Sequence, residues 1–212
     1  MSTYASISPA PAKKRRYIGV VIASVLIGAM ALDTKVIPIG SQEETGFSAE
    51  RYGAEQFPLV REDVEARAIE PATLIAELDA DQQAAGERYG VATSIGPILP
   101  ITFSGVVGEG RNGIYEIQVA GLPDSLTIRL QTGPAINGTD LRDATGSIEF
   151  GQFTNQIEYQ DAGAAINDEM KRQVLDEIDT SDLSGERVTA TGVFKLINPD
   201  NWLVTPVSLH VQ

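Results

Sequence analysis

A polar stretch in the middle of the chain, residues 131–159, holds most of the side chains that could do chemistry. Asp140 and Asp143 flank Arg142, and a third carboxylate, Glu158, follows in the same stretch. Carboxylates in such a group can act as acid and base on a glycoside, or they can supply oxygen ligands to a hard cation. The candidate ligand-binding or partner-binding residues are Asn137, Asp140, Arg142, Asp143, Asn155, Gln156, Glu158 and Tyr159.

The same residues also have a structural interpretation. Thr139 or Asp140 can cap a short helical turn that ends at Asp143, and Arg142 can pair with either carboxylate. Asn155 and its neighbour can satisfy backbone groups at the end of a strand. We favour this interpretation over ligand binding, and ligand binding over catalysis, because polar loops on rigid sheets mostly bind rather than react. We therefore predict no catalytic residue.

The composition removes several classes of chemistry. The 212 residues contain no cysteine and one histidine, His210, which lies near the C-terminus and is expected to face solvent. Thiol nucleophiles, disulfides, histidine-based triads and histidine-rich zinc sites are thereby excluded. Nucleophile-elbow, Walker and dinucleotide motifs are missing from the sequence, and the acidic run 179–186 has its glycine in the wrong place for a calcium loop. We predict no cofactor and no metal.

The N-terminal residues predict export. The basic cluster Lys13–Arg16 runs directly into Tyr17–Leu32, which carries no charge. At about 1.5 Å per residue this run spans roughly 24 Å as a helix, which is less than the roughly 30 Å hydrocarbon core of a bilayer. The small residues at 29–31 favour a cleaved signal peptide, whereas the long basic lead favours an uncleaved anchor, and both remain open. Either way, the basic cluster stays cytoplasmic and the rest is delivered outside.

The exported part is strongly acidic. Four of the sixteen basic residues lie in the N-terminal cluster, so the chain from Asp33 onward carries twelve basic against 29 acidic groups, a formal charge of −17. Such a charge repels phosphate backbones, and single-stranded nucleic acid needs a basic groove. We therefore expect no nucleic-acid partner.

Residues 33–95 are predicted to form a linker and a helical subdomain. Apolar residues recur at multiples of four within 48–67, which indicates a helix that Pro58 kinks or divides. Two further helices follow, one opened by a proline at its first position and one that ends at a Tyr-Gly pair. The residues that start, cap or end them are Pro71, Asp79 or Asp81, and Tyr89.

From residue 96 the apolar period changes from four to two. Three alternating segments precede the polar stretch, one helix follows it, and two more strands end the chain. This order is that of a five-stranded antiparallel barrel of the oligonucleotide/oligosaccharide-binding (OB) type, although an open meander with one helix across it also fits. The predicted elements are strands at 101–107, 115–119, 126–130, 188–196 and 202–211, and a helix at 166–178.

Several local features accompany these elements. Gly108–Gly113 is predicted as the turn between the first two strands, and Ile148 and Phe150 alternate as a strand would. Asp168 and Arg172 are spaced to pair on the outer side of the helix. The aromatic residues that could stack on a sugar are assigned instead to the core or the barrel rim; they are Tyr115 and Trp202.

The predicted fold class is thus α+β, with an N-terminal membrane helix, a helical subdomain and an OB-like barrel that carries one helix between strands three and four. The predicted divisions are a cytoplasmic basic N-terminus at 1–16, a transmembrane anchor or signal segment at 17–32, the linker and helical subdomain at 33–95, and the barrel at 96–212.

Five motifs stand out between Lys35 and Val211: Lys35–Gly40, Tyr89-Gly90, GPAINGTDLRDA at 133–144, FGQFTNQIEY at 150–159, and Leu203–Val207. They resemble the predicted periplasmic lipoproteins of domain of unknown function family 2291. The resemblance implies a bacterial inner-membrane location with the domain facing the periplasm or cell exterior, and gene neighbourhoods shared with carbohydrate uptake transporters. It carries over no activity. The chain departs from the lipoprotein pattern because it has no cysteine after its apolar run.

Two functions follow from these features. The first is a membrane-tethered extracytoplasmic module that binds a small solute or a sugar transporter component and assists carbohydrate uptake. The alternative is a carboxylate-dependent hydrolase of envelope glycans, in which Asp140 or Asp143 would be paired with Glu158. We favour binding because the sequence shows no matched acid/base pair.

Overall fold

The computed structural model describes Tyr17, Ile22, Ser24, Val25, Gly28 and residues 46–212. The chain divides into two units, Met1–Gly46 and Phe47–Gln212. The described residues between 17 and 28 are helical, and the rest of the predicted membrane segment 17–32 lies outside the described residues. Within the part of the chain that the structure describes, no helix has both the length and the apolar character needed to cross a bilayer.

Three helices open the second unit: α2 (Ala49–Arg67), α3 (Pro71–Ala80) and α4 (Gln82–Tyr89). As predicted, α3 starts at a proline, and Asp81 caps α4 by accepting a hydrogen bond from the Ala84 N–H at 3.0 Å. Of the two effects predicted for Pro58, a kink or a division of the first helix, the division does not occur, because α2 continues through the proline. The buried face on both sides of the proline, with Phe57 and Val60, holds α2 together by packing.

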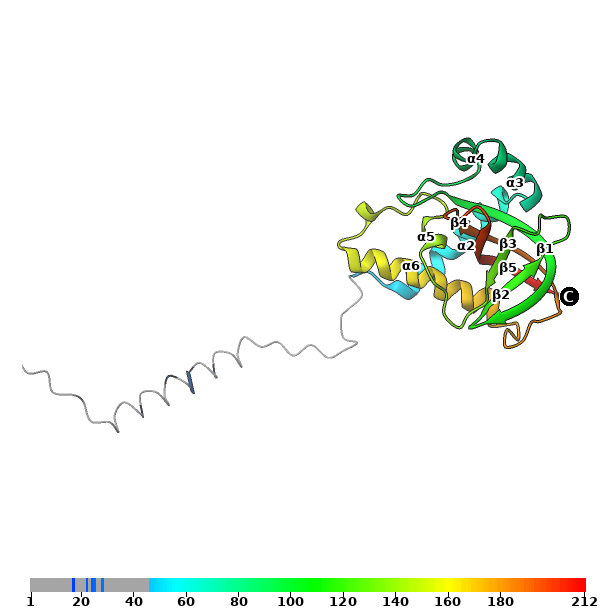
Figure 1. Cartoon of the computed structure of the whole chain (residues 1–212). Helices are drawn as coiled ribbons and strands as arrows, with labels where there is room; N and C mark the ends of the chain where they lie inside the picture. The colour runs from blue at the N-terminus through cyan, green and yellow to red at the C-terminus, as the bar shows by residue number, and fades with distance from the viewer. Residues whose placement is uncertain (1–16, 18–21, 23, 26–27, 29–45) are drawn as a thin grey trace, which may run out of the picture. The chain divides into compact units, whose positions relative to one another are not determined.

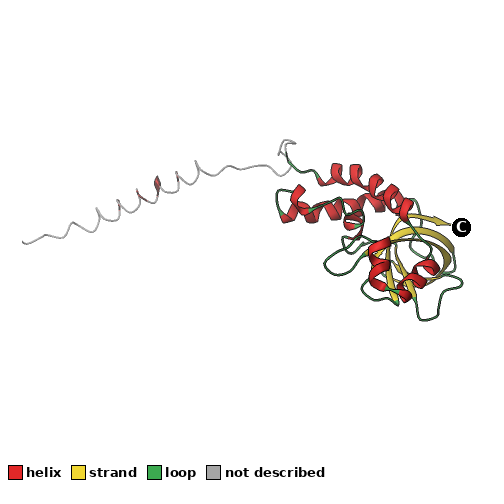
Figure 2. Cartoon of the chain, turned by 90° about the horizontal axis from the view of Figure 1, so that it is seen from above, coloured by secondary structure: helices red, strands yellow, loops and turns green. Residues whose placement is uncertain are grey.

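Five strands form the sheet: β1 (Ile98–Arg111), β2 (Ile114–Gln118), β3 (Thr127–Gln131), β4 (Arg187–Lys195) and β5 (Asn201–Val211). The first part of β1 pairs with β4 and its last part pairs with β2, so the sheet closes into a barrel in the order β1-β2-β3-β5-β4. Figure 2 shows the curved strands at one end of this unit. The α+β class and the five strands in their predicted order are confirmed.

The prediction of a wholly antiparallel sheet is wrong, because β3 and β5 run parallel, with Ile128 opposite Trp202. The other four pairings are antiparallel. A ring with an odd number of strands cannot alternate in direction all the way round, so one neighbouring pair has to be parallel. The closing β3–β5 pair meets that requirement.

The segment between β3 and β4 is more helical than predicted. It contains the short helix α5 (Asp140–Asp143), a 3-10 turn at Phe150–Gln152, and the long helix α6 (Gln156–Met170). A π-helical turn, Lys171–Leu175, extends α6. The alternation of Ile148 and Phe150 is not a strand: the Ile148 side chain is buried in an irregular segment, and Phe150 lies 53% exposed on the 3-10 turn.

One hydrophobic core serves both the helices and the barrel. Helix α2 packs against α6 (Figure 1) and contributes Phe57 to the same buried cluster as the barrel residues. Trp202 is fully buried and stacks on Phe194 with ring centroids 4.4 Å apart, so its assignment to the core is correct. The predicted boundary at residues 95/96 falls inside the unit Phe47–Gln212, because α2 completes the core of the barrel.

Candidate binding cleft beside helix α6

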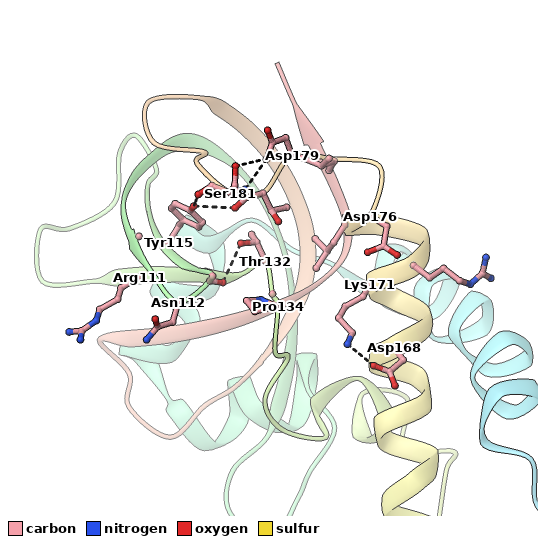
Figure 3. Close-up of a pocket in the computed structure, with 17 residues that line it drawn as sticks. Arg111, Asn112, Tyr115, Thr132, Pro134, Asp168, Lys171, Asp176, Asp179 and Ser181 are labelled. Carbon is pink, nitrogen blue, oxygen red and sulfur yellow. Dashed lines mark hydrogen bonds and ion pairs between the residues drawn. The ribbon is translucent and has the colours of Figure 1, made fainter.

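A cleft of about 870 Å³ lies between one rim of the barrel and the C-terminal end of α6 (Figure 3). We call it the rim cleft. Three separate segments line it: the β1–β2 turn, the loop after β3, and the end of α6 with the loop that follows. The lining residues that matter below are Arg111, Asn112, Gly113, Tyr115, Thr132, Gly133, Asp168, Lys171, Arg172, Asp176, Asp179 and Ser181.

The first wall is a tight hairpin turn. The predicted turn at 108–113 is shorter than expected, since β1 continues to Arg111 and only Asn112 and Gly113 connect it to β2. Their φ angles are 55° and 71°, and two consecutive positive φ values are the signature of the type I′ turn that Asn-Gly favours. Arg111 and Asn112 both line the cleft, and their exposed side chains extend outward from the turn (Figure 3).

The second wall presses directly against this turn. A Cβ atom on Gly113 would lie 1.0 Å from the carbonyl oxygen of Gly133, so the two backbones touch at a distance that only glycine allows. Thr132 closes the contact, because its N–H and its hydroxyl both donate to the Gly113 carbonyl, at 2.7 and 3.2 Å. Two loops that are far apart in sequence thus form one rigid rim.

The third wall contains the π-helical turn. The Asp176 N–H donates to the Lys171 carbonyl at 2.9 Å, five residues back, and this wider loop shifts the side chains that follow relative to a regular helix. Lys171, Arg172 and Leu175 of the turn all line the cleft. Isolated π-helical turns occur frequently at functional sites.

The charges of the cleft are balanced, with three basic and three acidic side chains. The predicted pair of Asp168 and Arg172 does not form: Asp168 binds Lys171 at 2.6 Å, and Arg172 turns to Glu169. The Arg172 hydrogen bond lowers the pKa of the Glu169 carboxyl below its ordinary value. The loop that follows the π-helical turn is also held in place, because the Tyr115 hydroxyl donates to the Thr180 and Ser181 carbonyls at 3.2 and 3.3 Å.

A second hollow of about 580 Å³ continues along α6 and shares Asp168 and Lys171 with the rim cleft. It is lined by three of the predicted residues, Arg142, Gln156 and Tyr159. The hollow brings part of the predicted polar stretch next to the rim cleft.

Arg142, however, is held by the protein itself. The side chain is 9% exposed, and its Nε donates to Oδ1 of Asp143 at 2.7 Å. One terminal nitrogen donates to the Tyr159 carbonyl at 3.2 Å, and the guanidinium carbon lies 3.7 Å from the centre of the Tyr159 ring. These contacts join α5 to the first turns of α6.

The predicted carboxylates also have protein partners. Asp140 forms an ion pair with Lys195 of β4 at 3.0 Å, and both side chains are largely buried. Oδ2 of Asp143 accepts a hydrogen bond from the Thr139 hydroxyl at 2.8 Å. The Thr139 side chain therefore does not cap the backbone at the start of α5. Glu158 accepts the Thr154 N–H at 2.9 Å, where α6 begins.

The two predicted asparagines serve the backbone. Asn155 is the N-cap of α6 and accepts the N–H groups of Ile157 and Glu158. The backbone of Asn137 exchanges two hydrogen bonds with the Gln131 side chain. Gln156 is exposed on the first turn of α6, which it does not help to cap.

Sequence reasoning missed the rim cleft because its residues come from three distant segments. Only the Asn112-Gly113 dipeptide carries a local signal, and that signal is for a turn rather than a site. Within residues 46–212 and the few described residues before them, no group of three His, Cys, Asp or Glu side chains is arranged to hold a metal. The cleft has the chemistry of hydrogen bonding to a polar molecule.

Two comparisons with known proteins bear on this geometry. The family model described as "Predicted periplasmic lipoprotein (DUF2291)" matches residues 20–210. The chain belongs to this family. The family description places the protein in the bacterial envelope and names no activity.

Among solved structures, the fold is similar to the crystal structure of an OB-fold protein from Thermotoga maritima. The match has a TM-score of 0.64 at 18% identity and covers 79% of this chain and 100% of the other. At that identity the likeness shows the fold alone, and it agrees with the OB-like barrel expected from the order of elements. No functionally curated protein matches the sequence.

Proposed function

We propose that this DUF2291 protein is a membrane-tethered extracytoplasmic module that binds a small polar solute in the rim cleft. The observation that carries the proposal is the construction of the cleft: a rigid rim made by the Gly113–Gly133 contact faces a helix end that presents Lys171 and Asp176. Ligand sites are commonly concave and preformed, with a few fixed polar groups.

The tether is the N-terminal segment. Lys13–Arg16 followed by the charge-free run Tyr17–Leu32 is the pattern of a helix that enters the membrane with its basic end in the cytoplasm. The chain has no cysteine, so none of its residues can carry a thioether-linked lipid. In this proposal a helix anchors the domain to the membrane, as the attached lipid does in a lipoprotein.

A sugar or another polyol is the solute class that we favour. The cleft offers paired acidic and basic side chains with backbone carbonyls nearby, which suits a neutral molecule rich in hydroxyl groups better than a strongly charged one. The resemblance to proteins encoded near carbohydrate transporters points in the same direction, and a transporter component would be the partner that receives the solute.

Hydrolysis is the weaker candidate. The alternative requires Asp140 or Asp143 to act with Glu158, yet each of these carboxylates accepts a hydrogen bond or an ion pair from the protein. A catalytic acid/base pair needs groups free to exchange protons with a substrate. We therefore propose binding.

The test is a thermal unfolding screen of the full chain in detergent against monosaccharides, short oligosaccharides and divalent cations. The only tryptophan, Trp202, lies in the barrel core, so its fluorescence reports unfolding of the domain directly. A ligand present at about a hundred times its dissociation constant should add roughly 2.7 kcal/mol of stability. For a domain of this size that corresponds to a rise of about 5–10 °C in the melting temperature.

Two arginine variants locate the site. Arg111→Ala, at the mouth of the cleft, should reduce the ligand-induced rise, whereas Arg187→Ala, an exposed arginine outside the cleft, should retain it. A panel that gives no rise, or a rise that is equal in both variants, would contradict the proposed site.

A further inference from the structure

The end of the domain at which its chain begins carries an unusual group of aromatic side chains. Phe47, the first residue of the second unit, lies 5.4 Å from Tyr52 and 5.7 Å from Phe153 between ring centroids. Phe153 in turn lies 5.3 Å from Tyr159, which contacts Phe150 at 5.7 Å. We call these five residues and Ile157, in the first turn of α6, the aromatic tip.

Two members of the tip present large apolar side chains to solvent. Phe150 is 53% exposed and Ile157 is 71% exposed, while the three aromatic rings of Tyr52, Phe153 and Tyr159 behind them are partly buried. The backbone that carries these two side chains is held by capping interactions. Gln152 and Glu149 form a capping box on the 3-10 turn, and Asn155 caps α6. Ordered structure therefore keeps the side chains of Phe150 and Ile157 exposed to solvent.

We infer that the aromatic tip inserts into the lipid surface next to the tether. The first argument is distance along the chain. Residues 33–46 separate the charge-free run from Phe47, and even fully extended they span at most about 50 Å. Because Phe47 is itself part of the tip, the proposed tether limits the distance between this end of the domain and the bilayer to about that span.

The second argument is composition. Phenylalanine and isoleucine beside tyrosine are typical of membrane-interface contacts, where the apolar body enters the acyl region and the tyrosine hydroxyl stays at the headgroups. Two exposed side chains are too few for a stable protein interface, which buries more than about 1,000 Å². They are enough to orient a domain that is already tethered.

The third argument concerns the type of lipid. The exposed charges on either side of the tip in sequence are mostly acidic, namely Glu50, Glu149 and Asp161 against Arg51. Acidic groups repel anionic headgroups. The tip therefore suits a zwitterionic surface, and its insertion should weaken as anionic lipid is added at low salt.

This inference rests on the proposed tether, and the experiment separates the two. The chain has no native cysteine, so single variants Phe150→Cys, Ile157→Cys and Ile197→Cys can each be labelled with an environment-sensitive dye. Ile197 is the matched control, because it is an isoleucine with 69% exposure in the loop between β4 and β5. The full chain is reconstituted into phosphatidylcholine vesicles with or without lipids that carry a nitroxide quencher.

Flotation of the vesicles tests the tether, and quenching tests the tip. We expect the chain to float with the vesicles, the dyes at 150 and 157 to be quenched, and the dye at 197 to stay bright. If the chain floats but the three dyes respond alike, the tether stands and the aromatic tip is not a membrane contact. A dye at 157 that is shielded from solvent but not quenched would show that a protein covers the tip, which also overturns the inference. Failure to float would overturn both proposals.

Discussion

Two polar regions flank α6, and they use their charges in opposite ways. Around α5, Asp140, Arg142 and Asp143 are nearly buried and bind one another, Lys195 or the backbone. At the rim cleft, Arg111 and Asp176 stand exposed at the mouth of a preformed hollow. The contrast teaches that the dense run of polar residues around α5 is used for internal hydrogen bonds, whereas the proposed binding surface is assembled from residues scattered along the chain.

The largest expected effect concerns the rigid rim. Gly113→Ala would place a methyl group on the Gly133 carbonyl at a positive φ angle, so we expect the free energy of unfolding to fall by about 2–4 kcal/mol. Urea denaturation followed by Trp202 fluorescence measures this. Gly151→Ala is the control, because a Cβ there meets nothing within 4 Å, and it should leave stability unchanged or up to about 1 kcal/mol higher. Equal stability of the two variants would mean that the loops do not form one rim.

The next effect distinguishes the two polar regions directly. Arg142→Ala leaves the largely buried Asp143 carboxylate without its ion-pair partner, which should lower the free energy of unfolding by about 2–3 kcal/mol. Arg111→Ala, at the exposed rim, should change it by less than about 0.5 kcal/mol while weakening solute binding. If Arg142→Ala instead kept full stability and lost solute binding, the polar stretch would be the binding site.

The smallest effect is a dependence on pH through Glu169, whose partner Arg172 lines the rim cleft. Because the Arg172 hydrogen bond lowers the pKa of Glu169 in the folded state, the charged carboxylate stabilises the fold above its unfolded pKa of about 4.3. That contribution is lost as the pH falls through the lowered pKa. Glu169→Gln should therefore be less stable than the wild type at pH 7, and the two should converge near the acid end of the transition. The exposed Glu65→Gln, measured by the same urea titrations, should follow the wild type at every pH.

The sequence predicted the sheet well because strand periodicity is local. The alternation of Ile101, Phe103 and Val107 with small or polar residues is repeated in the burial of β1, and the order of strands and helix led to the OB-like barrel. The parallel β3–β5 pair was missed although closure of five strands requires one.

The region before α6 was harder to predict, because its signals compete. The polar residues at 155–159 suggested loop, yet Asn155 and Glu158 are the caps that start a helix there. The structural interpretation of that stretch is right for Arg142, which pairs with Asp143. It is wrong in detail elsewhere, because Asn155 caps a helix and not a strand end, and Thr139 does not cap the backbone. The part of the stretch in ligand binding remains a prediction. The rim cleft could not be predicted, because contacts such as Gly113 against Gly133 depend on how two loops meet in space.

The closure of the sheet has a further consequence for how copies of this protein share a crowded compartment. Each of the five strands in the described part of the chain pairs with two others, so none leaves the whole of one edge unpaired. Long β1 achieves this by serving two neighbours in turn, β4 and then β2. Molecules confined to a surface meet often, and an open strand would let them add to one another end on end into fibrils. Because the barrel is closed, molecules that collide can separate again.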